Sequence, residues 1–273
     1  MKILIIGANS ILSKQLILQH TNDEVNIVYK TRPSYDSIKS FPISKINQIP
    51  PDYDIVYIVS AVITNDITKT DDIYDINIKL IQSICNKFLH SKIIFFSSVA
   101  VYDAIQAGII DEETLPSPQS VYGISKLWGE KIIEQHPKYG IIRISSMYGN
   151  EMKESTFLPK IIKSAIQENN IKLLGGGTRI QNYINVKDVA LLANKLALYN
   201  ENINILGISP SNQSNKEVAR IIKKITNCTI SFKGHDTSRS VEYKQSNHLL
   251  YQQNFTTLEQ GIKELIQWKI KQY

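Results

Sequence analysis

The sequence predicts an α/β fold, a doubly wound parallel sheet followed by a smaller C-terminal lobe. In the first half of the chain, short apolar runs alternate with longer segments of helical period. These runs are continuous, which is typical of parallel strands covered by helices on both faces. The second half is less regular. With 273 residues, 42% of them hydrophobic, the chain is long enough for one large domain, or for one domain with a smaller lobe.

The first half gives a regular order of elements. Strands are expected at Lys2–Ile6, Glu24–Tyr29, Asp54–Val59, Lys92–Phe96 and Gly140–Ile144. Helices are expected between them, at Ser10–His20, Asp71–Leu89 and Gln119–Gln135. Ligands bind such sheets at the carboxyl ends of the strands. We therefore predict a nucleotide-binding core over residues 1–147.

Residues 148–273 are predicted to form mainly the smaller lobe, with the alternative open that later segments return to the core. Helices are expected near Thr156–Gln167, Val186–Leu198, Asn215–Ile225 and Thr257–Ile270, with short strands between them. The segments Leu174–Thr178 and Gly207–Asn215 are rich in turn residues.

Composition excludes several classes of protein. The net charge is +6, but lysine and arginine form no dense block, so no nucleic-acid partner is expected. No apolar stretch approaches a membrane span, and the run Ile3–Ile6 is too short for a signal peptide. Cys85 and Cys228 are far apart, as expected for reduced thiols in a cytoplasmic protein. The five histidines show no metal-ligand spacing, so no metal is predicted.

The first strand runs into a turn and a helix, Gly7-Ala8-Asn9-Ser10-Ile11-Leu12-Ser13. A dinucleotide-binding turn usually carries three glycines, for the tight turn, the approach to the pyrophosphate and the packing of helix on strand. Gly7 keeps the first role, and Ser10 and Ser13 replace the other two. We predict cofactor contacts at Gly7, Asn9, Ser10 and Ile11, with the Ser10 hydroxyl able to bond a phosphate at the helix N-terminus.

The second strand ends in Tyr29-Lys30-Thr31-Arg32, with no acidic residue. An acidic residue there binds the ribose 2′-hydroxyl of NAD, whereas a basic residue accommodates the 2′-phosphate of NADP. Lys30 and Arg32 therefore favour NADP(H), and NAD(H) remains the alternative.

Three residue types point to proton transfer. The strand at Lys92–Phe96 leads into Ser97 and Ser98, and Tyr122 and Lys126 are four residues apart on a predicted helix, so they share a face. A tyrosine pKa lies near 10, and moving it toward neutrality needs roughly 3–4 kcal/mol. We expect the Lys126 ammonium to lower the pKa of Tyr122, and Ser98 to hold the substrate oxygen.

With these motifs the chain resembles the extended short-chain dehydrogenase/reductase family, in its branch of sugar-nucleotide epimerases, dehydratases and 4-ketoreductases. The matching segments are Gly7–Ser13, Asp54–Ala61, Asn77, Ser98–Tyr102, Tyr122 with Lys126 and Glu130, Arg143–Gly149, Tyr183–Ala190 and Thr257–Trp268. The resemblance implies a Rossmann-type core and the catalytic residues Ser98, Tyr122 and Lys126.

The resemblance also implies binding residues. Those for the cofactor are Gly7, Asn9, Ser10, Ile11, Lys30, Arg32, Ser60, Ala61, Asn77, Tyr122, Lys126 and Ile144. Those for the substrate are Thr64, Ser98, Val99, Tyr122, Ser146 and Gln181. Ser146 stands where the family has Asn, and Gln181 where relatives often have Arg, so the identity of the nucleotide stays open.

The function implied is NADPH-dependent reduction of the 4-keto group of a nucleotide-activated 6-deoxysugar, in the synthesis of deoxysugar or surface-polysaccharide precursors. The alternatives are an NAD-dependent sugar-nucleotide 4-epimerase and a non-catalytic NADP-binding sensor or scaffold. A 4,6-dehydratase fits less well, because Val99-Ala100 stands where those relatives carry Asp-Glu. The resemblance further implies a nucleotide-sugar substrate, no membrane partner, and a homodimer formed through the helices at Asp71–Leu89 and Gln119–Gln135.

Overall fold

The computed structural model describes residues 1–33, 35 and 37–272. The chain divides into two compact units. The first comprises Met1–Ala104, Thr114–Ile144 and Val189–Gly207, and the second Ile105–Glu113, Ser145–Asp188 and Ile208–Tyr273. Both units are discontinuous in sequence. Among the helices described, none combines the length and apolar composition needed to cross a bilayer.

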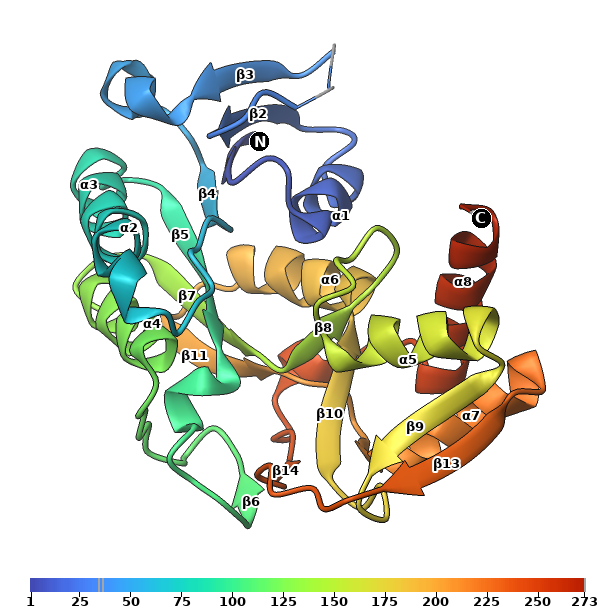
Figure 1. Cartoon of the computed structure of the whole chain (residues 1–273). Helices are drawn as coiled ribbons and strands as arrows, with labels where there is room; N and C mark the ends of the chain where they lie inside the picture. The colour runs from blue at the N-terminus through green and yellow to red at the C-terminus, as the bar shows by residue number, and fades with distance from the viewer. Residues whose placement is uncertain (34, 36, 273) are drawn as a thin grey trace. The chain divides into compact units, whose positions relative to one another are not determined.

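The first unit is built on a parallel sheet, which confirms the predicted fold class (Figure 1). In the described part of the chain, seven strands lie in the order β11-β7-β5-β4-β1-β2-β3, and every neighbouring pair is parallel. Their bounds are β1 Lys2–Ile6, β2 Glu24–Tyr29, β3 Lys39–Pro42, β4 Ile55–Ile58, β5 Lys92–Ser98, β7 Tyr139–Ile144 and β11 Ile203–Gly207. The chain order reverses at β1 and β4, and open sheets bind ligands at such a point.

Helices cover both faces of this sheet (Figure 1). The helices and helical turns of this unit are α1 Ile11–Gln19, η1 Ile43–Gln48, η2 Ile67–Lys69, α2 Thr70–Tyr74, η3 Asp75–Lys79, α3 Leu80–Lys87, η4 Val99–Tyr102, α4 Val121–Ile133 and most of α6 Val186–Ala197. On the α3 and α4 face, Ile84, Phe88 and Ile133 pack with Ile93 and Phe95 of β5, all fully buried. Burial on both faces explains why these strands read as continuous apolar runs.

Two features differ from the sequence expectation. The helix expected at Asp71–Leu89 is divided, because a π turn at Asp75–Lys79 separates α2 from α3, and the Leu80 N–H bonds to the Asp75 carbonyl. Strand β3 was not expected, since its four residues are mixed in polarity. Strand β11 lies late in the chain and pairs with β7, so a late segment belongs to the main sheet, which is the alternative that the sequence left open.

The second unit contains small sheets and three helices in its described residues. One sheet has the order β12-β10-β8, and two pairs are β13-β9 and β14-β6. The bounds are β6 Ile109–Ile110, β8 Ser146–Tyr148, α5 Phe157–Gln167, β9 Asn170–Leu174, β10 Ile180–Asn185, β12 Asn212–Ser214, α7 Asn215–Thr226, β13 Thr229–Lys233, β14 Glu242–Tyr243, η5 Leu249–Tyr251 and α8 Leu258–Ile270. Its core joins residues such as Ile162, Ile222 and Leu265, one from each helix.

Hydroxyl side chains fix where several helices begin. Ser10, Ser120, Ser214 and Thr257 precede α1, α4, α7 and α8, and each accepts a hydrogen bond from a backbone N–H of the first turn. Such caps satisfy donors that the helix itself leaves unpaired. This explains why the predicted helix starts agree with the structure to within one or two residues.

Candidate active site

The predicted cofactor turn lies at the carboxyl end of β1. Gly7 adopts φ +111°, a region that residues with a side chain rarely occupy. A Cβ at Gly7 would lie 2.7 Å from the backbone nitrogen of Ser60 and 2.9 Å from its hydroxyl oxygen. Glycine is therefore required here by both conformation and space. Gly7 thus allows the tight turn that leads from β1 into α1 and packs on the loop after β4.

Serine replaces the third glycine through a specific bond. The Ser13 side chain is completely buried and donates a hydrogen bond to the Gly7 carbonyl oxygen at 2.6 Å. This bond ties the first turn of α1 to the end of β1. The missing glycine is therefore compensated by a polar contact within the turn.

Ser10 and Asn9 also have defined partners. The Ser10 hydroxyl accepts from the Leu12 N–H at 3.1 Å, so it caps α1, and its proton remains able to bond a phosphate oxygen. Asn9 donates to the Thr31 carbonyl at 2.8 Å. This bond connects the turn to the segment after β2, where Lys30 and Arg32 are both exposed. The turn predicted to bind the cofactor phosphates is thus joined by this bond to the segment predicted to bind the ribose.

The loop after β4 contributes Ser60, Ala61 and Thr64. The Ser60 N–H bonds to the Ile6 carbonyl at 2.9 Å, which keeps this loop beside the cofactor turn. The Thr64 hydroxyl accepts from the Asp66 N–H at 3.1 Å. Ala61 and Thr64 are both half-buried.

Asn77, predicted to contact the cofactor, is buried in the π turn η3 with its amide engaged by the protein. Its oxygen accepts from the Val62 N–H at 2.8 Å, and its nitrogen donates to the Val62 carbonyl at 3.0 Å and to the Ser125 hydroxyl at 2.9 Å. These bonds hold the loop after β4 against α4. Its contact with a cofactor stays a prediction.

Ser98, Tyr122 and Lys126 all lie in the first unit, around the carboxyl end of β5. Ser98 is the last residue of β5, and Tyr122 and Lys126 lie one turn apart on α4. The Ser98 hydroxyl lies close enough to the Tyr122 phenol to lower the pKa of that phenol. Ser98 also accepts from the Ala100 N–H at 3.1 Å, so it caps η4. The structure therefore brings the predicted proton donor and the predicted oxygen-binding residue into contact.

Lys126 is 1% exposed, and its ammonium donates to the Phe96 carbonyl at 2.6 Å, 4.1 Å from the centre of the Phe95 ring. Burial lowers the pKa of Lys126 to about 7, while the charge of Glu130 raises it. The group is thus poised between its charged and neutral forms near neutral pH.

The expected pKa shift of Tyr122 is wrong in direction. Burial raises the pKa of Tyr122 to about 12, and the nearby Ser98 hydroxyl opposes this only in part. The reason is geometric, because the Lys126 ammonium is directed at the Phe96 carbonyl. At neutral pH Tyr122 is therefore a protonated phenol, which suits a proton donor.

Other residues that shape this site were missed from the sequence. A Cβ at Gly123 would lie 2.4 Å from the Ala100 carbonyl oxygen, so α4 and η4 meet backbone to backbone. The Asp103 carboxylate accepts from the N–H groups of Gln119 and Ser120, which fixes the start of α4. A glycine inside a helical pattern was the available signal for Gly123.

The remaining predicted residues lie in two places. Val99 begins η4, and Ile144 at the end of β7 is the register partner of Ser98. Ser146 and Gln181 belong to the second unit, on the paired strands β8 and β10. The Gln181 amide donates to the Tyr183 hydroxyl at 2.8 Å and to the Asn215 side chain at 2.9 Å. Their contacts with a substrate stay predictions.

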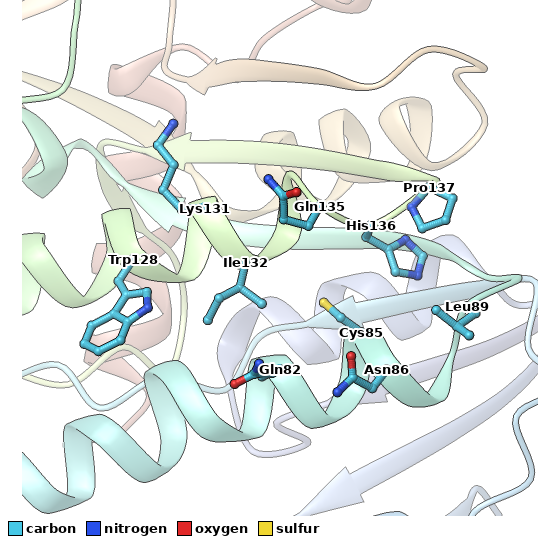
Figure 2. A pocket seen from close by; sticks show the side chains of 10 residues that line it. All are labelled: Gln82, Cys85, Asn86, Leu89, Trp128, Lys131, Ile132, Gln135, His136 and Pro137. Carbon is cyan, nitrogen blue, oxygen red and sulfur yellow. The ribbon is translucent and has the colours of Figure 1, made fainter.

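A separate pocket of about 330 Å³ lies between α3 and α4 (Figure 2). Its lining residues are Gln82, Cys85, Asn86, Leu89, Trp128, Lys131, Ile132, Gln135, His136 and Pro137. None of the predicted catalytic or cofactor-binding residues lines it. It lies on the two helices for which the homodimer is predicted, and that homodimer stays a prediction.

Comparison with known proteins gives a consistent result. The model of a family described as "NAD dependent epimerase/dehydratase family" matches residues 3–205. A Methanocaldococcus jannaschii protein named "Putative UDP-glucose 4-epimerase" is 28% identical over 80% of this chain and 77% of its own. "Uncharacterized UDP-glucose epimerase YtcB" of Bacillus subtilis is 25% identical over 68% of this chain, and the match spans 64% of that protein. The "GDP-6-deoxy-D-talose 4-dehydrogenase" of Aggregatibacter actinomycetemcomitans is 22% identical over 75% of this chain and 74% of its own.

Solved structures show the same fold. "MoeE5 in complex with UDP-glucose and NAD" has a TM-score of 0.85 at 19% identity, covering 100% of this chain and 99% of that one. UDP-glucuronic acid 4-epimerase from Bacillus cereus in complex with NAD has a TM-score of 0.83 at 19% identity, covering 100% and 97%. At this identity the likeness concerns the fold alone.

A first prediction concerns the cofactor turn. Gly7→Ala should lower the free energy of unfolding by about 1–3 kcal/mol, because it combines an unfavourable φ with a collision at Ser60. Gly108→Ala is the matched control, since Gly108 has φ +109° but nothing within 4 Å of its added Cβ. Denaturant unfolding compares the two variants. If both variants lose the same free energy of unfolding, the collision with Ser60 does not contribute and the prediction is wrong.

A second prediction concerns protonation. Ultraviolet titration of the phenolate signal, taken as the difference between the wild type and Tyr122→Phe, should place the Tyr122 pKa well above 10, at about 12. Burial disfavours the phenolate, so the acid form persists to higher pH than in a free tyrosine. A difference signal that titrates below pH 9 would contradict the structure.

Proposed function

Since this chain belongs to the NAD dependent epimerase/dehydratase family, we propose that it transfers hydride between a nicotinamide dinucleotide and C4 of a nucleotide-activated sugar. Members of this family are oxidoreductase-type enzymes of the extended short-chain dehydrogenase/reductase class, and this chain is such an enzyme. The observation that carries the proposal is the proximity of the Ser98 hydroxyl to the Tyr122 phenol, with Lys126 one turn away on α4.

In the proposed reaction Tyr122 is the general acid. Its phenol is protonated at neutral pH, and it donates that proton to the oxygen that becomes an alkoxide at C4. The Ser98 hydroxyl bonds the same oxygen and stabilises the charge that develops there. The Lys126 ammonium bonds the Phe96 carbonyl in this structure, and it would favour the phenolate left on Tyr122 once it is turned toward the phenol. NADPH or NADH, when bound, supplies the hydride.

Several residues fit such a cofactor. Gly7 lets the end of β1 pack directly on the backbone of Ser60 and turn tightly, and the N-terminus of α1 follows this turn. Asn9, Ser10, Ile11, Ser60 and Ala61 are proposed to hold its phosphates and ribose. Lys30 and Arg32 are exposed after β2, and we propose that they bind a 2′-phosphate, which gives a preference for NADP(H) over NAD(H).

For the net reaction we propose reduction of a 4-keto group on a nucleotide-linked 6-deoxysugar. Lys30 and Arg32 after β2 support this choice, because they favour NADPH. A net reduction consumes one NADPH in each turnover, so the enzyme must release the oxidised cofactor and bind a new one. Thr64, Ser98, Val99, Tyr122, Ser146 and Gln181 are the proposed substrate contacts. A relative named for a GDP-6-deoxy-D-talose 4-dehydrogenase activity is consistent with chemistry at C4.

A second candidate is an NAD-dependent 4-epimerase, favoured by the names of two relatives. It would use the same three side chains but retain its cofactor through oxidation and reduction of one substrate. A cytoplasmic homodimer is proposed for either reaction. The exposed Trp128, Ile124 and Tyr74 on α4 and α2 support self-association through this face of the first unit.

Replacement of the proposed acid tests the mechanism. Tyr122→Phe should reduce turnover of a 4-keto sugar nucleotide by at least about 10²-fold, with little change in the dissociation constant of the cofactor. Tyr74→Phe is the control, because Tyr74 is an exposed tyrosine of the neighbouring helix α2. A Tyr122→Phe enzyme with near wild-type turnover would exclude this mechanism. A wild type that binds cofactor but converts no nucleotide sugar would indicate a sensor or scaffold.

Cofactor titration separates the two candidates. Purified protein should bind NADPH about tenfold or more tightly than NADH, and Lys30→Ala/Arg32→Ala should remove this preference, since two cationic groups facing a phosphate are lost. Lys79→Ala is the control, as its ammonium is exposed near Asp75. NAD that stays bound through purification would instead favour the 4-epimerase.

A further inference from the structure

A buried ion pair lies behind the proposed catalytic side chains, and the mechanism above does not use it. Glu130 of α4 has no exposed surface, and Arg143 of β7 is 6% exposed. The Arg143 guanidinium donates to both oxygens of the Glu130 carboxylate, from Nε to Oε1 at 3.0 Å and from Nη2 to Oε2 at 2.8 Å. Removing two charges from water is costly, so such a pair is weak support for stability by itself. A role in positioning the neighbouring groups accounts for it better.

The same guanidinium reaches the segment that follows Ser98. Its Nη1 donates to the Tyr102 hydroxyl at 2.5 Å, and its central carbon lies 5.2 Å from the centre of the Tyr102 ring. Tyr102 is fully buried and ends η4, the turn that Ser98 caps. Arg143 is also the register partner of Ser97 in β5. One side chain therefore connects α4, η4 and β7, the elements that carry or flank the three proposed catalytic residues.

Glu130 also acts on Lys126 by its charge. It lies four residues after Lys126 on α4, so the two side chains share a face of the helix. Burial lowers the pKa of the Lys126 ammonium to about 7, and Glu130 is the charge that opposes this effect. The Phe96 carbonyl and the Phe95 ring, its other contacts, carry no net charge. Without the carboxylate, desolvation would favour the neutral amine at neutral pH.

The elements packed on α4 offer no other buried carboxylate among the described residues. Strand β5 contacts Lys126 through the Phe96 carbonyl and the Phe95 ring, neither of which carries a net charge. Tyr122 on α4 itself is neutral at pH 7. The acidic and basic side chains of α2 and η3, which are exposed, are Asp71, Asp72, Asp75 and Lys79.

We propose that Glu130 is a positioning residue that favours the charged form of Lys126 near neutral pH and, through Arg143 and Tyr102, holds α4 on η4. This role rests on the proposed function, because the charge of Lys126 matters to turnover only if Tyr122 transfers a proton. Arg143 supports this role, because its charge stabilises the buried Glu130 carboxylate, which would otherwise have no cationic partner.

A titration of Lys126 tests this without any substrate or cofactor. The full chain is labelled with ¹³C-lysine, and the Lys126 signal is identified by its absence in Lys126→Met. Glu130→Gln keeps the size of the side chain and removes its charge, so the acid dissociation constant of Lys126 should rise about tenfold. Glu130→Asp keeps the charge and should restore most of the wild-type value. Glu134→Gln, on the next turn of α4 and paired with Lys131, should leave it unchanged.

A second variant covers the case in which Glu130→Gln does not fold. Glu130→Met/Arg143→Met removes the pair as a whole, which proteins often tolerate because no buried charge is left alone. It should show a smaller rise in the dissociation constant of Lys126 than Glu130→Gln, because a cation is removed together with the carboxylate. A constant within about twofold of wild type in folded Glu130→Gln, or no rise in the double variant where only that variant folds, would overturn the proposal; folding is judged by circular dichroism.

Activity provides an independent readout. If Lys126 must be charged, kcat/KM falls as pH rises through the Lys126 pKa, and Glu130→Gln should move this alkaline limb to lower pH by the same factor as in the titration. A uniform loss at every pH would indicate a structural role only and would contradict the proposal. If the wild type converts no nucleotide sugar, the proposed function fails, while the titration still decides whether Glu130 sets the charge of Lys126.

Discussion

The close contact between α4 and η4 is the constraint on which the candidate site depends. At Gly123 the helix backbone lies so near the Ala100 carbonyl oxygen that no Cβ fits between them. This approach brings Tyr122, the residue before Gly123, close to Ser98 at the end of β5. It also encloses Lys126 between the helix and the sheet. The contact between α4 and η4 therefore sets both the position of Tyr122 and the burial of Lys126.

Burial of so many polar groups is tolerated because they have partners. Lys126 bonds a carbonyl, Glu130 and Arg143 bond each other, and the Asn77 amide uses both donors and its acceptor within the protein. An unpaired polar atom in the interior would cost about 1–3 kcal/mol. A network of this kind favours one arrangement over others, since any displacement would break several bonds together. Proton-transfer chemistry needs such a fixed geometry.

The same principle explains how a turn with one glycine works. Gly7 is needed where backbone meets backbone, but Ser13 faces a carbonyl that its hydroxyl can bond. From the sequence, Gly7 keeps the role of the first glycine and Ser13 replaces the third, but the bond that Ser13 forms is visible only in the structure. Asn77 is predicted to contact the cofactor, and the structure adds that its bonds to Val62 and Ser125 connect two segments of the protein. Spacing along the chain cannot show partners that are 15 or 48 residues away.

The sequence by itself determined the class of fold, the order of strands and helices in the core, and the identity of Ser98, Tyr122 and Lys126 as a set. It could do so because hydrophobic periodicity, helix caps and i, i+4 spacing are local properties. Only the tertiary structure decided the direction of the Tyr122 pKa, the bond from Lys126 to Phe96, and the contact of Glu130 with Arg143. These depend on desolvation and on charges brought together from distant segments, and both arise only when the sheet and its covering helices are packed.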